Sequence, residues 1–310
     1  MAVLKVLFVY SGNVPPMPFI AEQKKSLQKK GVIVEDFLIK GKGWLGYLKN
    51  IVKLRQAIIR GDYDLVHAHY GLSALLCVMQ RRAPVVSTFH GSDLNFSRNV
   101  FWSRIAALLS SANIVVNSDM QRKLSSLRSE VLPCGVDLEI FKPLDKSDAR
   151  LALGLNVEKK YILFSSSFTN PVKNYSLAKE AVELSSVDCE ILELKDRSRD
   201  EVNLLMNASD MLLMTSISEG SPQVVKEAMA CNLPVISNDV GDVGRLIKGV
   251  DHCFLVHGDA NSFSKRVKGF FSSSGLPRSN GRDHVSKFSL CAIADRIIDV
   301  YLSVLKPNKS

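Results

Sequence analysis

Two glutamates, Glu219 and Glu227, stand eight residues apart in the segment Ser-Glu-Gly-Ser-Pro-Gln-Val-Val-Lys-Glu-Ala-Met-Ala. The apolar run that starts at Asp210 predicts a buried strand before them, and the Ala-rich stretch from about Gln223 predicts a helix. In open α/β sheets ligands bind at such a junction, where free N–H groups at the helix start attract anions. One carboxylate can accept hydroxyls of a sugar while the other accepts hydroxyls of a ribose. The alternative is an ordinary helix start, because the helix dipole favours acidic residues there without any ligand.

The length and composition indicate a cytoplasmic protein of two domains. The chain has 310 residues, and a typical domain takes roughly 100 to 200. No stretch approaches the roughly 18 uninterrupted apolar residues that a membrane span needs, and the short apolar start predicts a first strand rather than a signal peptide. The six cysteines show no paired spacing of the metal or redox kind, which indicates free thiols in a reducing compartment.

Strand-like and helix-like runs alternate along the chain, which is typical of parallel βαβ units. The expected strands lie at 4–10, 32–39, 65–68, 85–89, 113–118, 130–137, 161–165, 190–194, 211–215, 234–237 and 253–256. The expected helices include 19–30, 44–60 and 72–80. Proline and charged residues from Phe141 onward interrupt the series. We therefore predict an α/β protein with two Rossmann-like domains, residues 1–143 and 144–290, followed by a last helical segment, 291–310.

The net charge of +9 belongs to the first of these domains. Residues 1–143 hold 19 Lys and Arg against 10 Asp and Glu, whereas residues 144–310 hold 21 of each kind. Most of the excess lies between Lys24 and Arg60, where residues 44–48 add a Trp, a Tyr and two Leu. Such side chains can enter a lipid headgroup layer while lysines meet its negative charge, so an anionic membrane surface is an expected partner. The alternative is a solvated helix face, and no motif for binding nucleic acid is present.

The segment around the two glutamates closely resembles the Glu-x7-Glu signature of the retaining glycosyltransferases of family four, whose fold is called GT-B. The residues that keep the family's pattern are Gly220, Pro222, Ala228, Met229, Ala230, Pro234 and Val235. Asn232 stands where the family usually has Gly, and Asn tolerates the left-handed conformation better than most residues. The resemblance implies two Rossmann-like domains that face each other across a cleft, with the last helix crossing back to the first domain.

The resemblance also implies how the donor is bound. In the family the first Glu approaches the donor sugar and the second holds the nucleotide ribose, while an Arg and a Lys on the first loop of the second domain bind the diphosphate. Lys173 falls on the Lys position, but Ser167 stands where the Arg would be. A Ser hydroxyl donates one hydrogen bond without supplying charge, so the backbone N–H groups around the helix start must contribute more. The expected donor-binding residues are Lys173, Ser167, Glu219, Gly220, Ser221, Pro222, Gln223 and Glu227.

Two histidine motifs resemble segments of the family's first domain. The first motif, Asp64-Leu-Val-His-Ala-His, looks like the family's strand that ends in a His-x-His turn, and His69 is its second histidine. The second motif, Thr88-Phe-His-Gly-Ser-Asp, places His90 at the end of the next strand. Family members use such a His near the donor sugar and the acceptor, where it can hydrogen-bond a hydroxyl or stabilise the developing positive ring. Asp93 is expected to cap the following helix or to orient the loop. The alternative is that these histidines are structural, since an i, i+2 pair without a third ligand is a poor metal site.

The remaining motifs concern the acceptor and a metal. The loop from Ser11 retains only Gly12 of a Gly-rich turn, so we expect Gly12 and Asn13 to border the acceptor, with His69 and Asp93 on the same side. Asp62-Tyr-Asp64 leads into a buried strand and predicts a structural role. Leu132-Pro-Cys-Gly-Val-Asp resembles the family's hinge segment, with Cys134 in place of the usual Asn as a packing change.

These features predict a retaining, metal-independent hexosyl- or related glycosyltransferase. It would move a sugar from a nucleotide diphosphate sugar, the co-substrate, to a hydroxyl of a lipid-linked or saccharide acceptor, with His90 and Glu219 as catalytic residues and no further cofactor. The basic first domain predicts peripheral binding to the inner face of the plasma membrane, in surface polysaccharide or glycolipid assembly. One alternative is a non-catalytic GT-B partner subunit that binds nucleotide-sugar or membrane, which Ser167 favours. A nicotinamide-dependent dehydrogenase is the other, and the missing Gly-rich fingerprint disfavours it.

Overall fold

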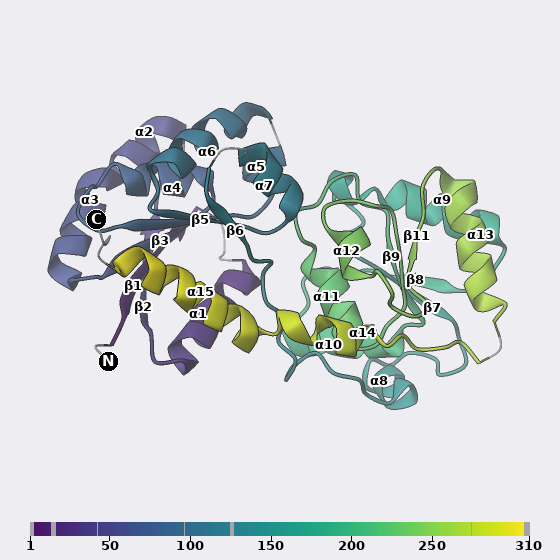
Figure 1. Ribbon diagram of the computed structural model, residues 1–310. Helices are drawn as coiled ribbons and strands as arrows, with labels where there is room; N and C mark the ends of the chain where they lie inside the picture. Colours follow the sequence, from purple (N-terminus) through teal and green to yellow (C-terminus); the bar gives the residue numbers. More distant parts are fainter. Residues whose placement is uncertain are drawn as a thin grey trace. The chain divides into compact units, whose positions relative to one another are not determined.

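The computed structural model describes residues 3–13, 17–41, 43–95, 97–124, 127–273 and 275–306, with the backbone alone at 43, 44, 95 and 97–99. The chain divides into two compact units (Figure 1). Unit 1 comprises Met1–Gly135 together with Leu290–Ser310, and unit 2 comprises Val136–Ser289. Part of the first loop, 14–16, and two positions of the expected membrane contact, Lys42 and the side chain of Trp44, lie outside the described residues.

Unit 1 is built on a six-stranded parallel sheet in the order β2-β1-β3-β4-β5-β6. Its strands are β1 (Lys5–Ser11), β2 (Ile33–Ile39), β3 (Leu65–His69), β4 (Val85–Phe89), β5 (Ala112–Val115) and β6 (Ser129–Val131). Its helices are α1 (Pro18–Lys29), α2 (Gly43–Leu48), α3 (Asn50–Gly61), α4 (Gly71–Val78), α5 (Ser92–Asn95), α6 (Ser97–Leu109), α7 (Ser118–Leu124) and α15 (Leu290–Leu305).

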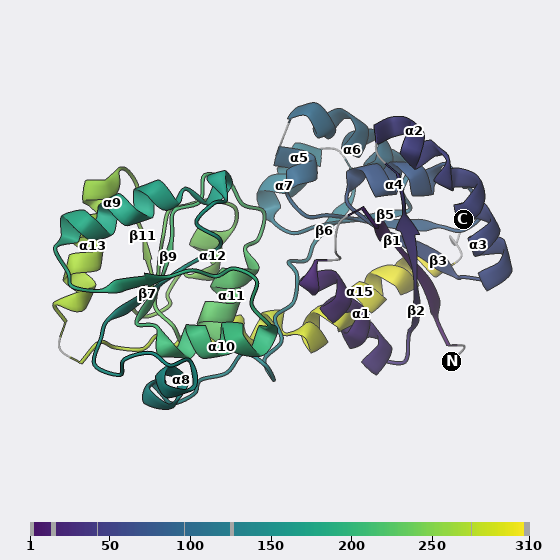
Figure 2. The same cartoon turned by 180° about the vertical axis from the view of Figure 1, so that it is seen from behind.

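The central strands of unit 1 are covered by helices on both faces, which explains their continuous apolar runs. Helices α3, α4 and α6 pack with Val66 and Ala68 of β3 in one core. On the opposite face α1 and α15 lie side by side (Figure 2). Because successive side chains of a strand alternate between faces, His67 and His69 point to the side opposite Val66 and Ala68. Tyr301 of α15 contacts His67, so α15 covers this histidine face.

Unit 2 is built on a five-stranded parallel sheet in the order β11-β10-β9-β7-β8. Its strands are β7 (Tyr161–Phe164), β8 (Glu190–Leu192), β9 (Met211–Met214), β10 (Val235–Ser237) and β11 (Phe254–Leu255). Its helices are α8 (Lys146–Ala152), η1 (Pro171–Lys173), α9 (Tyr175–Ser185), α10 (Arg199–Ala208), α11 (Gln223–Ala230), α12 (Val243–Leu246), α13 (Ala260–Phe271), α14 (Gly281–Val285) and η2 (Ser286–Phe288). One apolar core joins the sheet to α9 and α13, and another joins it to α10, α11, α12 and α14.

The division into units differs from the predicted boundaries of 143/144 and 290/291. The chain passes to unit 2 after Gly135 because Val136 and Phe141 are fully buried in the core of unit 2. The guanidinium of Arg282 also donates to the carbonyl oxygen of Phe141 at 2.7 Å. The last helix starts at Leu290 and belongs to unit 1.

The helix predicted over 44–60 is two helices, α2 and α3, which meet at Lys49. Asn50 is the physical reason. Its buried side chain donates to the carbonyl oxygens of Gly46, at 2.7 Å, and of Lys40, at 2.9 Å. Asn side chains that bond to nearby carbonyl groups compete with the helical hydrogen bonds, so the chain turns here.

Candidate functional site

The loops that follow β7 and β9 lie at the same edge of the unit 2 sheet, because β7 and β9 are parallel neighbours. Hydrogen bonds tie the two loops together. The hydroxyl of Thr215 donates to the carbonyl oxygens of Lys173 at 3.1 Å and Asn174 at 2.9 Å, and the N–H of Ile217 donates to Val172 at 2.8 Å. The sequence-predicted residues of these loops are therefore held near one another.

Lys173 and Glu219 form an ion pair at this edge. The ammonium Nζ lies 2.6 Å from Oε1 of Glu219, and the two side chains are 19% and 13% exposed. Lys173 ends η1, whose start is capped by the side chain of Asn170. Because the pair is short and only partly exposed, each partner neutralises the other while remaining within reach of a ligand.

Close backbone packing fixes the loop between Glu219 and α11. Gly241 has a φ of +62°, and a Cβ at this position would lie only 2.4 Å from the carbonyl oxygen of Gly220. Ser221 accepts a hydrogen bond from Nζ of Lys226 at 3.2 Å, although the Lys226 side chain is fully buried. Asp242 lies beside them, and burial raises its pKa while the charge of Lys226 lowers it. A buried charged cluster thus stands behind the loop that carries Glu219.

Helix α11 begins with Gln223, and its N-cap residue, Pro222, makes no side-chain capping hydrogen bond. Its first N–H groups are therefore directed at the loop edge, as in anion-binding helix starts. Glu227 lies one turn further on, with only 5% of its side chain exposed. Its Oε1 accepts from the guanidinium of Arg199 at 2.8 Å. Arg199 in turn lies over the ring of Phe141, 4.5 Å from its centroid.

Ser167 occupies a different environment from that of Lys173. Its hydroxyl donates to Oε1 of Glu193 at 3.0 Å, and the same oxygen accepts from the N–H of Phe168 at 2.7 Å. The bond from the Phe168 N–H is the main cause that lowers the pKa of Glu193 below its ordinary value. Glu193 is therefore a carboxylate at neutral pH, and it adds negative charge beside Ser167.

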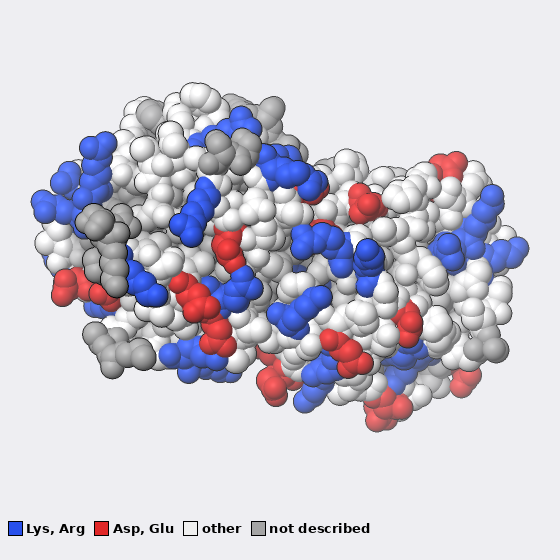
Figure 3. Space-filling model, in the orientation of Figure 1, with Lys and Arg blue, Asp and Glu red and all other residues white. Residues whose placement is uncertain are grey.

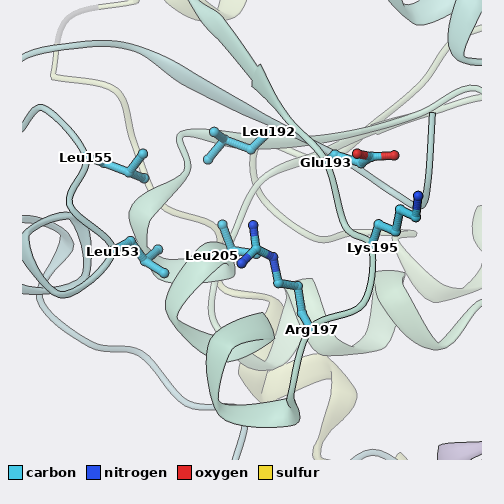
Figure 4. A pocket seen from close by; sticks show the side chains of 7 residues that line it. All are labelled: Leu153, Leu155, Leu192, Glu193, Lys195, Arg197 and Leu205. Carbon is cyan, nitrogen blue, oxygen red and sulfur yellow. The ribbon is translucent and has the colours of Figure 1, made fainter.

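A cavity of about 230 Å³ opens beyond the end of β8. It is lined by four leucines and three charged residues (Figure 4), namely Leu153, Leu155, Leu192, Leu205, Glu193, Lys195 and Arg197. Glu193 is shared between this cavity and the Ser167 loop. A flat, mostly apolar group that also needs hydrogen bonds at its edge would suit these surroundings.

Unit 1 stacks three histidines, of which His67 and His69 are buried and His90 is half-buried. The rings of His67 and His69 stack with centroids 4.5 Å apart, and those of His69 and His90 with centroids 5.4 Å apart. Nδ1 of His67 lies 2.6 Å from the hydroxyl of Tyr301, and its Nε2 lies 2.7 Å from Thr88. Burial lowers the pKa of His67 to about 3 and that of His69 well below its ordinary value, so both imidazoles are neutral near pH 7.

His90 ends this stack at the β4 loop. Its Nε2 lies 3.1 Å from Nδ1 of His69, and its Nδ1 lies 3.6 Å from the sulfur of Cys134. Asp93 accepts from the backbone N–H groups of His90 at 3.2 Å and Gly91 at 2.9 Å, so it orients the loop. Cys134, predicted as a packing change, thus contacts the histidine that the sequence singled out.

Gly12 and Asn13, predicted to border the acceptor, connect β1 to the segment after β2. The N–H of Gly12 donates to Ile39 at 2.8 Å. The side chain of Asn13 donates to the carbonyl oxygen of Gly41 at 2.8 Å and accepts from the Gly41 N–H at 3.0 Å. Both residues therefore shape this loop pair, while the stretch 14–16 lies outside the described residues.

Several residues of these sites carry no recognisable signal in the sequence. Arg199 starts α10, Glu193 follows β8, and Tyr301 lies on the last helix, each far along the chain from its partner. Lys226 does carry a signal, because it stands between the two glutamates on a face that is otherwise buried. A lysine at such a position indicates a buried charge partner.

Part of the positive charge of unit 1 lies on or beside two helices, α1 and α3. On α1, Lys24 pairs with Asp36 at 2.5 Å and Lys30 with Asp295 at 2.8 Å. On α3, the apolar side chain of Ile59 is 60% exposed among exposed Lys and Arg residues, and Figure 3 shows basic side chains over this helix. No described helix is long and apolar enough to cross a lipid bilayer. Within the described part of the chain, no three His, Cys, Asp or Glu residues are grouped so that they could hold a metal ion.

Two family profiles match the chain. The one described as Glycosyltransferase Family 4 matches residues 9–140, and the one described as Glycosyl transferases group 1 matches residues 177–273. A putative teichuronic acid biosynthesis glycosyltransferase, TuaC of Bacillus subtilis, is 27% identical over 66% of this chain and 60% of its own length. The D-inositol 3-phosphate glycosyltransferase of Mycobacterium marinum is 25% identical over 82% of this chain and 66% of its own length. The chain therefore spans less than two thirds of each of these two relatives.

Solved structures resemble the whole chain. Sucrose-phosphate synthase from Thermosynechococcus elongatus superposes with a TM-score of 0.82 at 16% identity, covering 97% of this chain and 99% of that one. Anabaena Alr3699/HepE, solved in complex with UDP and glucose, superposes with a TM-score of 0.78 at 20% identity, covering 97% and 100%. At these identities the likeness concerns the fold.

Proposed function

We propose that this chain, which belongs to the glycosyltransferases of family four and has the GT-B fold, transfers a sugar from a nucleotide diphosphate sugar to an acceptor hydroxyl with retention of configuration. The family profiles and the solved structures confirm the family and the fold that the sequence predicted. The observation that carries the proposal is that both signature glutamates lie at one sheet edge, each within 2.8 Å of a cation. Carboxylates for hydroxyl groups and cations for a diphosphate are what such a donor requires.

In this proposal Lys173 binds the diphosphate. When the donor arrives, its negative charge competes with Glu219 for the ammonium, and Glu219 becomes free to accept hydroxyls of the donor sugar. The backbone N–H groups in the first turn of α11 add hydrogen bonds to the same anion. Bond cleavage places further charge on the leaving phosphate, so these donors act most strongly in the transition state.

We assign the ribose to Glu227 and the base to the cavity beyond β8. The short distance from Glu193 to Ser167 supports this order, because it connects the cavity to the loop that carries Lys173. The four leucines suit the faces of a planar base, while Lys195 and Arg197 can donate to its carbonyl oxygens. HepE, solved with UDP and with UDP-glucose, makes a uridine nucleotide a reasonable first candidate.

We assign the acceptor side to unit 1. The imidazole of His90 can exchange a hydrogen bond with a sugar hydroxyl, and Asp93 fixes its loop. We propose that the leaving phosphate accepts the proton of the acceptor hydroxyl on the same face of the sugar, and that no metal ion takes part. Retention then needs no enzymic nucleophile.

We further propose that the acceptor is a saccharide or a lipid-linked intermediate of surface polysaccharide assembly, and that unit 1 binds an anionic membrane. The likeness to TuaC supports the pathway class, and the exposed apolar and basic residues of α3 support the membrane contact. Lys53→Glu with Ile59→Asn should weaken binding to phosphatidylglycerol vesicles, whereas Lys24→Ala, which removes a charge already paired with Asp36, should change it little. Unchanged binding of the double variant would rule out this contact.

The decisive experiment is a thermal-shift screen against UDP-, GDP-, ADP- and dTDP-sugars, followed by a transfer assay with the sugar that binds. A ligand that binds only the folded state raises the melting temperature in proportion to its saturation. Glu219→Ala and Glu227→Ala should fold and lose transfer. Full transfer by either variant would refute the site assignment.

One observation favours a non-catalytic partner subunit as a second candidate. The hydroxyl of Ser167, which stands where the family has an Arg, donates to the carboxylate of Glu193 and supplies no charge for a diphosphate. A purified chain that binds a nucleotide-sugar yet transfers and hydrolyses nothing until a second protein is added would support this candidate over the enzyme.

A further inference from the structure

Helix α6 of unit 1 presents an apolar face to solvent. Phe101, Leu108 and Leu109 are 63%, 66% and 56% exposed, and Trp102, whose ring contacts that of Phe101, is 39% exposed. Phe101 and Leu108 are two turns apart, as are Trp102 and Leu109, so the four share one side of the helix. The side chains that α6 buries are small ones, namely Ser103, Ala106 and Ala107. A helix normally turns its polar side to water, so this exposed apolar side indicates an interaction surface.

The charges around this face have one sign. The helices that cover the same side of the sheet, α2, α3, α4 and α6, contain no Asp or Glu, and every charged residue in them is a Lys or an Arg. Arg104 is exposed one turn before Leu108, beside the apolar face. By contrast, α1 and α15 on the opposite side of the sheet contain Glu22, Asp295 and Asp299. A surface that is apolar and purely cationic complements an anionic lipid layer.

Neighbouring helices of the same layer extend the exposed apolar area. Helix α4 contacts both α3 and α6. Leu72 and Met79 of α4 are 42% and 45% exposed, and Val52 and Ile59 of α3 are 64% and 60% exposed. A second copy of the chain fits this layer poorly, because two surfaces that carry only positive charge repel each other. A lipid bilayer brings apolar chains and negative headgroups together, and it therefore suits the layer better.

Helix α6 also holds the loop of His90. The hydroxyl of Ser103 donates to the carbonyl oxygen of Asp93 at 2.9 Å. The carboxylate of Asp93 in turn accepts from the backbone N–H groups of His90 and Gly91. A surface bound at α6 is therefore connected through two sets of hydrogen bonds to the loop that we assign to the acceptor.

We propose that α6 is the membrane-inserted helix of this chain. Its apolar face enters the acyl region of an anionic bilayer, while Arg104 and the basic residues of α3 meet the headgroups. This inference rests on the membrane contact in the proposed function and adds the element that inserts. Charge attracts the protein to the surface, and burial of the apolar side chains supplies a part of the affinity that salt does not screen. A lipid-linked acceptor would then be presented beside the His90 loop.

The first test measures insertion directly by fluorescence. The chain has two tryptophans, Trp44 and Trp102, so Trp44→Phe leaves the one on α6 as the single reporter. Vesicles of phosphatidylglycerol and phosphatidylcholine are prepared with bromine atoms on their acyl chains, which quench only a tryptophan that reaches them. Trp102 should be quenched. A protein that sediments with the vesicles while Trp102 keeps its full fluorescence would overturn the insertion of α6.

The second test removes the apolar face. Phe101→Ser with Leu108→Ser should weaken binding to the same vesicles by at least about 10-fold, because each apolar side chain that enters lipid contributes binding free energy. The matched control is Leu151→Ser with Leu184→Ser in unit 2, which removes two leucines that are 66% and 49% exposed. It should leave vesicle binding unchanged. Thermal unfolding of both double variants shows that they remain folded.

The outcomes separate this inference from the proposed function. If the parent and Phe101→Ser with Leu108→Ser bind vesicles equally, α6 does not insert, and the contact through α3 remains. If light scattering shows a dimeric parent and a monomeric double variant, the face is an interface between copies, and the inference is again overturned. If the parent binds no anionic vesicle, the proposed membrane contact fails as well, while transfer to a soluble saccharide is tested separately by the transfer assay.

Discussion

The candidate sites of the two units differ in the charge of their buried polar groups, which are neutral in unit 1 and charged in unit 2. In unit 1 the buried groups are the imidazoles of His67 and His69, which burial keeps neutral. In unit 2 they are carboxylates in contact with cations, as in the pairs Lys173–Glu219 and Arg199–Glu227. The overall charges differ as well, with 21 basic and 10 acidic residues in unit 1 against 19 and 21 in unit 2.

This difference follows from what each unit is proposed to bind. A charged donor can replace one partner of an ion pair, so the pairs hold the site ready while it is empty. A hydroxyl acceptor brings no charge, and a charged imidazole without a partner would be costly to bury. The sites should therefore respond to different perturbations, unit 2 to the loss of a charge partner and unit 1 to acid or to the loss of a hydrogen bond.

The largest effect is expected in unit 2 when Lys226 is replaced by Met. The side chain of Lys226 is fully buried, and its charge lowers the pKa of Asp242, which burial raises. Removing one of two interacting buried charges costs up to about 3 to 5 kcal/mol, so Lys226→Met should destabilise unit 2 by an amount in that range. Hydrogen exchange of the β9 amides measures the change within unit 2.

The double variant Lys226→Met with Asp242→Asn is the control. It should recover part of the loss, because no unpaired charge then remains buried. If Asp242→Asn instead adds a full further loss, the two residues act independently. In that case the stability of unit 2 would not depend on the attraction between Lys226 and Asp242, and these two residues would not support the contrast with unit 1.

The sequence predicted much of the fold because local patterns are strong here. The apolar runs at 85–89 and 211–215 became buried parallel strands, and Asn232 adopts the left-handed conformation expected at its position, with a φ of +55°. The boundary after Gly135 was missed because it depends on where Val136 and Phe141 are buried, which periodicity does not reveal. The break before Asn50 was missed because it depends on hydrogen bonds from the Asn50 side chain to the carbonyl oxygens of Gly46 and Lys40, which the apolar periodicity does not reveal.

The second largest effect is a pH dependence of unit 1. His67 has a pKa of about 3 in the fold, against roughly 6.5 in the unfolded chain. Below pH 6.5 the unfolded chain therefore takes up a proton that the folded chain refuses, so stability is lost as the pH falls toward 3. Linkage gives a loss of about 2 kcal/mol from this residue at pH 5. Hydrogen exchange of the β3 amides at pH 5 and pH 7 measures it.

Substitution of His67 separates this effect from other acid-sensitive groups. His67→Gln should reduce the difference between pH 5 and pH 7, whereas replacing the exposed His252 of unit 2 by Gln should not. Burial raises the pKa of Asp93, so this residue stabilises the fold as the pH falls. Asp93 is present in both the parent and the His67→Gln variant, so its contribution cancels when the two are compared. If the stability of His67→Gln depended on pH as strongly as that of the unaltered chain, His67 would not be the source of the acid sensitivity.

The candidate site was predictable to the extent that it is local in sequence. Glu219 and Glu227 stand close together where a strand hands over to a helix, so their spacing pointed to them, whereas Lys173 was selected by the resemblance of its loop to that of the family. Arg199 was missed because its relation to Glu227 arises only when α10 packs beside α11. Tyr301 was missed for the same reason, since it reaches His67 from the last helix of the chain.

A smaller effect is expected from Tyr301→Phe. The hydroxyl of Tyr301 is the partner of Nδ1 of His67 at 2.6 Å, and no water can replace it easily because both side chains are buried. Loss of a partner for one buried polar atom costs about 1 to 2 kcal/mol, again measured at the β3 amides. Tyr63→Phe is the control, because the Tyr63 hydroxyl bonds to Glu35 at the surface and water can take its place.

The smallest effect should come from the surface of the same helix. Asp295 pairs with Lys30 at 2.8 Å, but the two side chains are 56% and 31% exposed, so water and salt screen the attraction. Asp295→Asn should leave exchange of the β3 amides unchanged within error, in low salt and in high salt. Because Asp295 and Tyr301 attach one helix to unit 1 through different forces, their two variants measure which force matters. Asp295→Asn could instead destabilise unit 1 as much as Tyr301→Phe does, with an effect that high salt removes. In that case an ion pair would stabilise unit 1 as well, and the contrast with unit 2 would be wrong.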